Sequence, residues 1–320
     1  MDKKSLRIVY MGTPDFAVES LKALVEGGYN VVGVITMPDK PIGKSHSILS
    51  CSPVKKYALS QNLPLLQTEK LKDSEFIEAL KEWNADLQIV VAFRMLPEIV
   101  WNMPRLGTFN LHASLLPQYR GAAPINWAII NGETETGITT FFLTHEIDTG
   151  KIIDQVKIPI SDTDNAEIIH DKLMDLGASL VIKTVDNILN DAIKPIAQEE
   201  LLNNAQELKS APKIFKETCQ IDWNKDTKSV YDFIRGLSPY PAVWTILKTL
   251  QGEEIILKVF EAEKCFENHN LDFGTIKTDG KSYLDIAVRD GFIRLLSIQQ
   301  AGKKRMLTID FLRGNGHLFV

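Results

Sequence analysis

Two polar side chains, Asn110 and His112, interrupt an otherwise apolar β-type run, TFNLH, at residues 108–112. Residues two apart on a strand point to the same face, so these two side chains project together. The end of such a strand is where open α/β sheets build their binding sites. The alternative interpretation is a core histidine with satisfied hydrogen bonds beside a turn-forming asparagine, and the short pattern taken alone favours it.

A carboxylate at Asp148 suggests what this pair could do. It lies in HEIDTGKII (145–153), between two β-like runs, where Asp-Thr-Gly is also ordinary turn chemistry. If Asp148 reaches His112, it could fix the tautomer of the ring and raise its basicity, as in acyl-transfer triads. Asn110 could then donate a hydrogen bond to an oxyanion. No serine or cysteine stands in a nucleophile motif such as GxSxG, so the three residues suit direct attack by a substrate amine.

The elements that must hold these residues follow from the hydrophobic pattern. Over the first 190 residues, apolar runs of strand length alternate with amphipathic stretches. This alternation favours a doubly wound, mostly parallel α/β sheet. After the first strand, Thr13 is expected to cap a helix that has Pro14 in its first turn. We expect strands at 6–11, 30–36, 64–67, 87–93, 108–112, 136–143 and 150–160, and helices at 53–61, 75–83 and 166–189.

The chain changes character near residue 190. Residues 191–210 are polar and are expected to be a linker between a catalytic domain at 1–190 and a C-terminal domain at 211–320. Beyond one helical stretch at 228–236, the C-terminal domain has short β-like runs separated by Gly, Asp and Asn. That pattern predicts a small β-barrel of the OB type.

Composition narrows the function classes. The 320 residues carry a formal net charge of −5, so global charge indicates neither nucleic-acid nor membrane binding, although a local basic patch is compatible with it. Three scattered cysteines without a Cys/His cluster argue against a zinc site or a disulfide framework and fit a reducing cytosol.

The N-terminal apolar run indicates a buried strand rather than a signal peptide, and the run at 87–93 is too short to span a bilayer. GTPDF is not a phosphate-binding loop, so no nucleotide cofactor is expected.

The motifs resemble those of the folate-dependent formyltransferase superfamily, through NLHASLLP (110–117), YRGAAP (119–124) and DTG (148–150). Further stretches resemble its methionyl-tRNA formyltransferase branch in particular. They are MGTPDFAVESL (11–21), PDKPIGK with SPVK (38–44 and 52–55) and LLSIQQAGKKRM (295–306). The resemblance extends over essentially the whole chain.

The resemblance implies a concrete reaction and site. Members transfer the formyl group of 10-formyltetrahydrofolate, a co-substrate, to the amino group of methionine on the initiator tRNA, without a metal. By carry-over, the catalytic residues are Asn110, His112 and Asp148. The implied tetrahydrofolate-lining residues are Ser114, Leu115, Leu116 and Pro117, and the implied tRNA-contacting residues are Lys40, Lys44, Lys303 and Lys304. A cytoplasmic monomer is expected, with charged initiator tRNA and a tetrahydrofolate derivative as partners and no membrane.

The chain departs from the family pattern in three places. Where the family has AYGxxLP, residues 92–97 read AFRMLP, so Arg94 is expected to reshape the wall on the pterin side. The loop at 38–51 has few cations, and Lys44 stands where the family commonly has an arginine. Lysine lacks the guanidinium fork, so its contact with tRNA should differ. This loop is expected to be mobile without tRNA. His145 and Glu146 are bulkier and more polar than is usual.

Two other functions are compatible with these residues. A sugar-nucleotide N-formyltransferase would share the folate site and the catalytic residues, and a non-catalytic RNA-binding protein could use the same scaffold. The complete set of Asn110, His112 and Asp148 argues against the RNA-binding protein. The C-terminal domain and the basic stretch at 295–306 argue against the sugar enzyme, although GKKRM (302–306) by itself would suit a solvated β-turn.

Overall fold

The computed structural model describes residues 2–42, 48–202 and 207–320, and these pack into two compact units. The first unit comprises Met1–Gly121, Gly137–Ile158 and His170–Ser210, and the second comprises Ala122–Thr136, Pro159–Ile169 and Ala211–Val320. Two stretches from within the predicted catalytic domain, residues 1–190, therefore pack with the C-terminal part of the chain.

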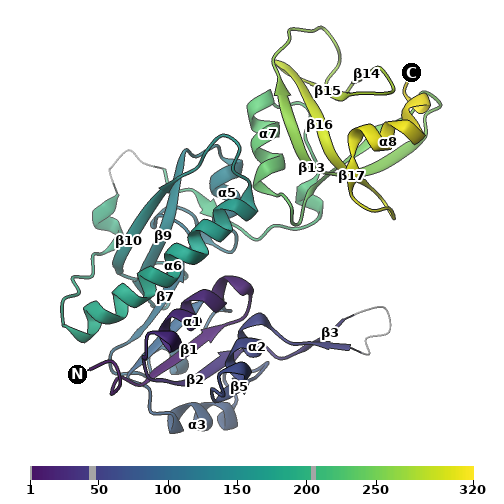
Figure 1. The fold of residues 1–320 in the computed structure, drawn as a ribbon. Helices are drawn as coiled ribbons and strands as arrows, with labels where there is room; N and C mark the ends of the chain where they lie inside the picture. Colours follow the sequence, from purple (N-terminus) through teal and green to yellow (C-terminus); the bar gives the residue numbers. More distant parts are fainter. Residues whose placement is uncertain (1, 43–47, 203–206) are drawn as a thin grey trace. The chain divides into compact units, whose positions relative to one another are not determined.

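A seven-stranded, mostly parallel sheet forms the centre of the first unit (Figure 1). Its strands lie in the order β10-β9-β7-β6-β1-β2-β5. The strands from β5 to β7 are parallel, and β9 is antiparallel to β7. The bounds are β1 Ile8–Gly12, β2 Val31–Thr36, β5 Leu65–Gln67, β6 Leu87–Val91, β7 Thr108–His112, β9 Glu135–Phe142 and β10 Ile152–Pro159. The predicted α/β fold with a mostly parallel sheet is confirmed.

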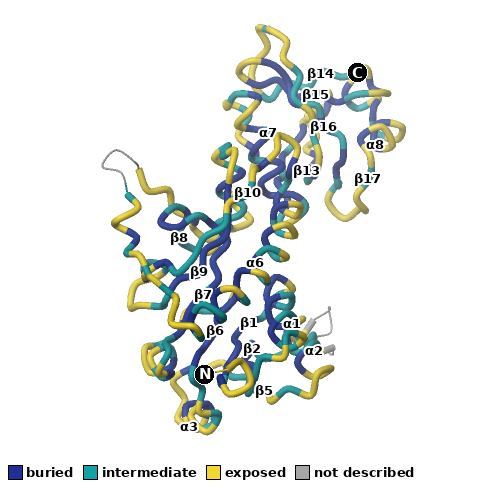
Figure 2. Tube along the Cα trace, turned by 60° about the vertical axis from the view of Figure 1, so that its left-hand side comes forward, coloured by how far each residue is buried: buried dark blue, intermediate teal, exposed yellow. Residues whose placement is uncertain are grey.

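Helices cover both faces of this sheet, whose strand β1 is buried along its whole length (Figure 2). Successive residues of a strand point to opposite sides, so β1 packs against helices on both faces. On one face, the Tyr10 hydroxyl donates to Ala17 O at 2.5 Å beside α1. On the other face, Val9 and Met11 pack in one cluster with Leu80 of α3. The helices are α1 Val18–Glu26, α2 Pro53–Ser60, α3 Ser74–Glu82, α4 Glu98–Trp101 and α6 Ala166–Leu189. This is the doubly wound arrangement.

The start of the first helix differs from the prediction. Thr13 does not cap it, because a 3-10 turn, η1 (Asp15–Ala17), follows Pro14 and α1 begins only at Val18. The Thr13 hydroxyl instead accepts a hydrogen bond of 3.4 Å from Met37 N, directly after β2. The Thr13 hydroxyl, which could have capped the helix, therefore joins the segments that follow the neighbouring strands β1 and β2.

The stretch 38–51 contains two short strands that the sequence did not predict. β3 (Lys40–Ile42) pairs antiparallel with β4 (Ile48–Ser50). Asp39 holds the base of this pair, because its carboxylate accepts from Lys55 Nζ at 2.6 Å and from Gln67 Nε2 at 3.2 Å. The hydrogen bond from Lys55 lowers the pKa of Asp39. Lys44 lies outside the described residues.

An antiparallel half-barrel organises the second unit, with strand order β12-β13-β16-β15-β14 and β17 paired to β16. It confirms the prediction of a smaller C-terminal β fold. The strands are β12 Val243–Lys248, β13 Glu254–Cys265, β14 Ile276–Thr278, β15 Leu284–Val288, β16 Gly291–Gln300 and β17 Met306–Leu307. Short elements elsewhere are β8 Arg120–Gly121, β11 Ser210–Ala211, η3 Glu217–Cys219 and η4 Gly316–Leu318.

Helices α5, α7 and α8 lie wholly in the second unit, and of these only α7 was predicted. α7 (Thr227–Gly236) was expected, and its Val230 and Ile234 are buried in the half-barrel core. α8 (Thr308–Asn315) adds Phe311 to that core, and α5 (Pro124–Ile130) packs Ile130 against it. Proline in the first turn of α5 is a helix-start signal that was available in the sequence.

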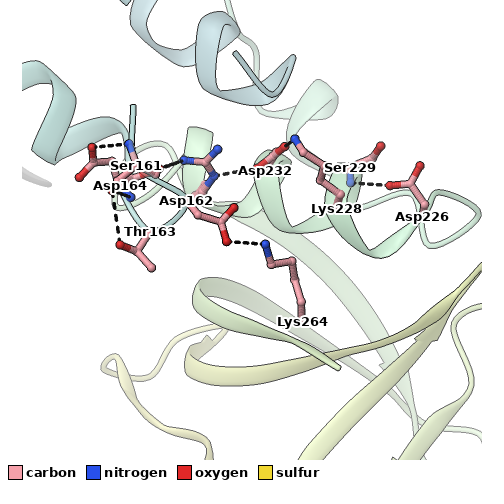
Figure 3. Close-up of polar contacts among 10 residues, drawn as sticks. Ser161, Asp162, Thr163, Asp164, Asp226, Lys228, Ser229, Asp232 and Lys264 are labelled. Carbon is pink, nitrogen blue, oxygen red and sulfur yellow. Dashed lines mark hydrogen bonds and ion pairs between the residues drawn. The ribbon is translucent and has the colours of Figure 1, made fainter. Parts of the chain in front are cut away.

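A polar network joins the stretch before α6 to α7 within the second unit (Figure 3). The buried Arg235 pairs with the buried Asp232, at 2.7 Å from Nε to Oδ1, and donates to Asp164 O at 2.7 Å. Asp162 Oδ2 lies 2.6 Å from Lys264 Nζ on β13, and this hydrogen bond lowers the pKa of Asp162. Arg235 thus links the main chain at Asp164 to Asp232 of α7. Separating these groups would leave a buried charge without its partner, so the network holds the residues before α6 against α7.

Part of the stretch 191–210, expected to be a linker, packs inside the first unit. Ile196 exchanges two backbone hydrogen bonds of 2.9 Å with Ile152 of β10. Gln198, which begins η2 (Gln198–Leu201), is fully buried. These residues of the expected linker thus pack within the first unit, which polar composition did not reveal, because it gives no sign of a buried side chain whose hydrogen bonds are all internal.

Candidate active site

β7 places Asn110 and His112 on one face of the first unit's sheet. Asn110 lies opposite Val90 of β6 and Phe141 of β9, and His112 lies opposite Thr139. The side chain of Asn110 is half-buried and has no hydrogen-bond partner among the residues that the structure describes. A half-buried amide in this state retains its N–H groups for a bound molecule.

The ring of His112 is buried, and its two nitrogens have different surroundings. Nε2 lies 2.9 Å from Tyr119 O. A carbonyl oxygen can only accept, so Nε2 must carry a hydrogen, and in the neutral ring the lone pair belongs to Nδ1. Nδ1 faces Asp148 Oδ2 at 3.8 Å, which is too long for a hydrogen bond. The structure thus leaves one ring nitrogen, Nδ1, available for proton transfer.

Asp148 sits in a left-handed turn with φ of 56°, and its side chain is 12% exposed. Its Oδ2 accepts a hydrogen bond of 2.9 Å from Gly121 N. The sequence suggested that Asp148, if it reached His112, could fix the tautomer of the ring. At 3.8 Å Asp148 makes no hydrogen bond to the ring, and the Tyr119 carbonyl fixes the tautomer. Asp148 instead supplies a negative charge beside Nδ1.

The predicted folate-lining residues form a compact loop directly after β7. Ser114 Oγ donates to Gln118 O at 2.7 Å. The Thr139 hydroxyl donates to Ser114 O at 2.7 Å, and Gln155 Nε2 donates to Leu116 O at 2.7 Å. Three of the four predicted residues are buried, and only Leu115 is half-exposed; the buried ones are Ser114, Leu116 and Pro117. The loop therefore offers its main chain and one leucine side chain to a ligand.

Arg94, a departure from the family pattern, is hydrogen-bonded to the main chain at residues 68–69. Its Nη1 and Nη2 donate to Glu69 O at 2.6 Å and Thr68 O at 2.5 Å. Burial lowers the pKa of Arg94, and its Nε has no hydrogen-bond partner in the described part of the chain. The guanidinium thus braces the main chain at 68–69 instead of pointing into water.

The predicted tRNA-contacting lysines belong to different units. Lys40 is exposed on β3 of the first unit, and Lys303 and Lys304 are exposed in the turn between β16 and β17 of the second. Arg305, in the same basic stretch, is engaged within the half-barrel. Its Nη2 lies 2.5 Å from Glu261 Oε1, and its guanidinium stacks on the Phe260 ring at 4.5 Å.

A cavity of about 590 Å³ lies next to this turn in the second unit. Its wall includes Tyr240, Trp244, Lys216 and Lys258 and extends to Gly302. Tyr240 is 83% exposed. Aromatic faces beside cations suit contact with nucleic-acid bases and phosphates.

Sequence reasoning missed two residues that hold the site. The carbonyl of Tyr119 orients His112, and the buried side chain of Gln198 contacts the turn at 148–150. A main-chain carbonyl leaves no mark on residue type, and a glutamine in a polar stretch gives no signal of burial. Within the described ranges, no group of three or more His, Cys, Asp or Glu side chains could hold a metal, and no helix is both long and apolar enough to cross a membrane.

Comparison with known proteins shows the family to which the chain belongs. Residues 6–185 match the family described as Formyl transferase, and residues 213–316 match the family described as Formyl transferase, C-terminal domain. The chain is 70% identical over 314 residues to the methionyl-tRNA formyltransferase of Bacteroides thetaiotaomicron, with 98% of this chain and 97% of that protein covered. It is 67% identical over 314 residues to the same enzyme of Parabacteroides distasonis, with the same coverage of 98% and 97%.

The fold is also similar to that of a more distant protein. A crystal structure of a sugar 3N-formyl transferase in the presence of dTDP and 5-N-formyl-THF matches with a TM-score of 0.65 and 22% identity, over 93% of this chain and 99% of that chain. At this identity the similarity concerns the fold alone.

Proposed function

Because the chain belongs to the methionyl-tRNA formyltransferase family, we propose that Asn110, His112 and Asp148 carry out its reaction. The enzyme transfers the formyl group of 10-formyltetrahydrofolate to the α-amino group of methionine on the initiator tRNA. The observation that carries the assignment is the unused Nδ1 of His112, which faces Asp148 at 3.8 Å while Nε2 is bound to Tyr119 O.

Each of the three groups has a distinct role in this proposal. The α-amino group attacks the formyl carbon, and His112 Nδ1 accepts the proton that the amine loses. The imidazolium formed in this way lies beside the Asp148 carboxylate, which stabilises it. The free amide of Asn110 donates to the oxygen that gains negative charge on the attacked carbon. The proton then passes to the N10 atom of the departing tetrahydrofolate.

The loop at 114–117 holds the tetrahydrofolate part of the donor in this proposal. Because Ser114, Leu116 and Pro117 are buried, the loop acts through its main chain and the side chain of Leu115. Hydrogen bonds from Thr139 and Gln155 fix the loop's carbonyl groups, so the surface is formed before the donor binds. The sequence prediction was only that residues 114–117 line the tetrahydrofolate site.

Residues 211–320 serve as the tRNA platform, with the first unit carrying the chemistry. The exposed Lys303 and Lys304 neutralise phosphates, and the adjacent cavity with Tyr240 offers a stacking face. Lys40 and Lys44 contact the tRNA from the stretch 38–51. The enzyme acts as a monomer in the cytoplasm, where charged initiator tRNA and folate donors are both present.

A formyl-transfer assay tests the reaction against the alternative of a sugar-nucleotide enzyme. Charged initiator tRNA and amino-sugar nucleotides are each offered with 10-formyltetrahydrofolate, and the formylated product is quantified. The identity of about 70% to methionyl-tRNA formyltransferases supports the tRNA substrate. A higher kcat/KM for an amino-sugar nucleotide would overturn the proposal.

A further inference from the structure

We propose that Gln198 is a positioning residue that holds Asp148 in its working geometry. This inference rests on the role proposed above for Asp148. Gln198 is fully buried, although it lies in a polar stretch. Its side-chain Nε2 lies 2.8 Å from Asp148 O and 2.8 Å from Gly150 O, so it contacts both ends of the turn that presents the carboxylate.

The orientation of the Gln198 amide is set by its partners. The two carbonyls of the turn can only accept, so the NH2 group must face them. On the other side, Oε1 accepts from Arg120 Nε at 3.0 Å and from Arg120 Nη2 at 2.7 Å, and a guanidinium can only donate. The amide therefore uses both N–H groups and both lone pairs. Among protein side chains, only the primary amide of Asn or Gln offers two N–H donors and an oxygen with two lone pairs.

The turn that Gln198 holds needs external support. Asp148 has φ of 56°, a left-handed conformation that is unfavourable for most residues other than glycine. Position 150 accepts only glycine, because the Phe142 carbonyl lies so near that a Cβ there would be 1.6 Å from its oxygen. A backbone in an unfavourable conformation persists only where the surrounding structure holds it in place. The two hydrogen bonds from Gln198 to the carbonyls of Asp148 and Gly150 are part of what holds this turn.

Arg120 extends the same arrangement to the rest of the site. It lies between Tyr119, whose carbonyl accepts from His112, and Gly121, whose N–H donates to Asp148 Oδ2 at 2.9 Å. Because Gln198 binds the Arg120 side chain, it steadies this strip of main chain as well as the turn. One side chain thus fixes both sides of the 3.8 Å gap between His112 Nδ1 and Asp148 Oδ2.

The test uses the full-length enzyme and two substitutions of Gln198. Gln198→Leu removes all four hydrogen bonds. Gln198→Glu keeps the shape and the contact with Arg120 but sets an oxygen against the two carbonyls, and it carries the same test if the leucine variant does not fold. Loss of a supporting hydrogen bond around a functional group typically costs roughly 10–100-fold. We expect kcat for formylation of charged tRNA to fall by such a factor in both variants, with little change in either KM.

Repeating the Gln198 substitution in a second enzyme, the Asp148→Asn variant, distinguishes a positioning role of Gln198 from a general loss of stability. In Asp148→Asn enzyme, Gln198→Leu should lower kcat by less than about threefold, since groups that act as a unit are not additive. The matched control is Gln88→Leu, which removes another fully buried glutamine, bonded to Thr108 on the sheet. It should lower thermal stability and leave kcat per folded molecule unchanged in either background.

The outcomes are distinguishable. If Asp148→Asn alone has wild-type kcat, the role proposed for Asp148 fails. If Asp148→Asn is slow but Gln198→Leu costs the same factor in both backgrounds, only the positioning role of Gln198 is overturned. Wild-type kcat in Gln198→Glu would also overturn it, because the two donated hydrogen bonds would then be dispensable.

Discussion

Replacement of Asp148 by asparagine removes one negative charge from the site and changes little else. The amide oxygen of asparagine can still accept the hydrogen bond from Gly121 N that Asp148 Oδ2 accepts at 2.9 Å. The left-handed turn is also retained, because asparagine tolerates positive φ better than most residues. The substitution therefore isolates the electrostatic contribution of the carboxylate to the reaction.

The size of that contribution follows from the 3.8 Å between His112 Nδ1 and Asp148 Oδ2. At an effective dielectric constant of about 20, unit charges at this distance attract by about 4 kcal/mol. The carboxylate side chain is 12% exposed, so water screens part of this attraction. An interaction of about 2–4 kcal/mol present only when the imidazolium forms corresponds to roughly a 30- to 1,000-fold decrease in kcat.

Single-turnover formylation of charged initiator tRNA at saturating donor measures this decrease. The KM values for both substrates should change little, since the stabilised charge arises only during the reaction. A variant whose rate lies within about threefold of wild type would refute the reasoning, because a charge at this distance could not then assist the transfer. An increase in KM at constant kcat would equally contradict it and assign Asp148 to substrate binding.

Three further results are expected. Asn110→Ala should lower kcat by roughly 100–1,000-fold through the loss of an oxyanion donor, and a rate near wild type in single-turnover assays would remove that role. Lys303→Glu with Lys304→Glu should weaken tRNA binding and flatten its salt dependence at unchanged kcat, as measured by filter binding, whereas Lys281→Glu in the same unit should not. Activity should survive exhaustive chelation, since the proposed transfer uses only side-chain groups and the two substrates; loss on chelation with rescue by a divalent ion would contradict the assigned roles.

Local patterns predicted the elements that bear on the site. The alternation in TFNLH placed β7 at 108–112, where the structure has it, and the long amphipathic stretch placed α6 at Ala166–Leu189. α6 buries one face along a regular element, and the hydrophobic period reports that directly. β7 is buried on both faces, and its short β-type run bounded by turn residues marked it as a strand. Elements that depend on tertiary contacts were missed, such as β3 and β4, whose base is held by Asp39.

The candidate site was predictable only in part. Residue type and spacing singled out His112 and Asp148, because imidazole and carboxylate are chemically distinctive. They did not reveal that a main-chain carbonyl, Tyr119 O, would occupy Nε2 and leave Nδ1 free. Nor did they reveal Gln198, because a side chain whose role is to bind two carbonyls and a guanidinium has no fixed sequence distance from its partners.

The second unit is built from three segments that are far apart in the chain, and this affects how it forms during synthesis. α5 and the stretch before α6 leave the ribosome long before α7 and the half-barrel strands against which they pack. Until then Ile130, which packs against the half-barrel core in the finished protein, has no completed core to cover it. Exposed apolar surface on a partly made chain promotes aggregation. A chain that ends before α7 leaves this surface uncovered, so truncation in the C-terminal domain also exposes apolar residues of the segment around α5.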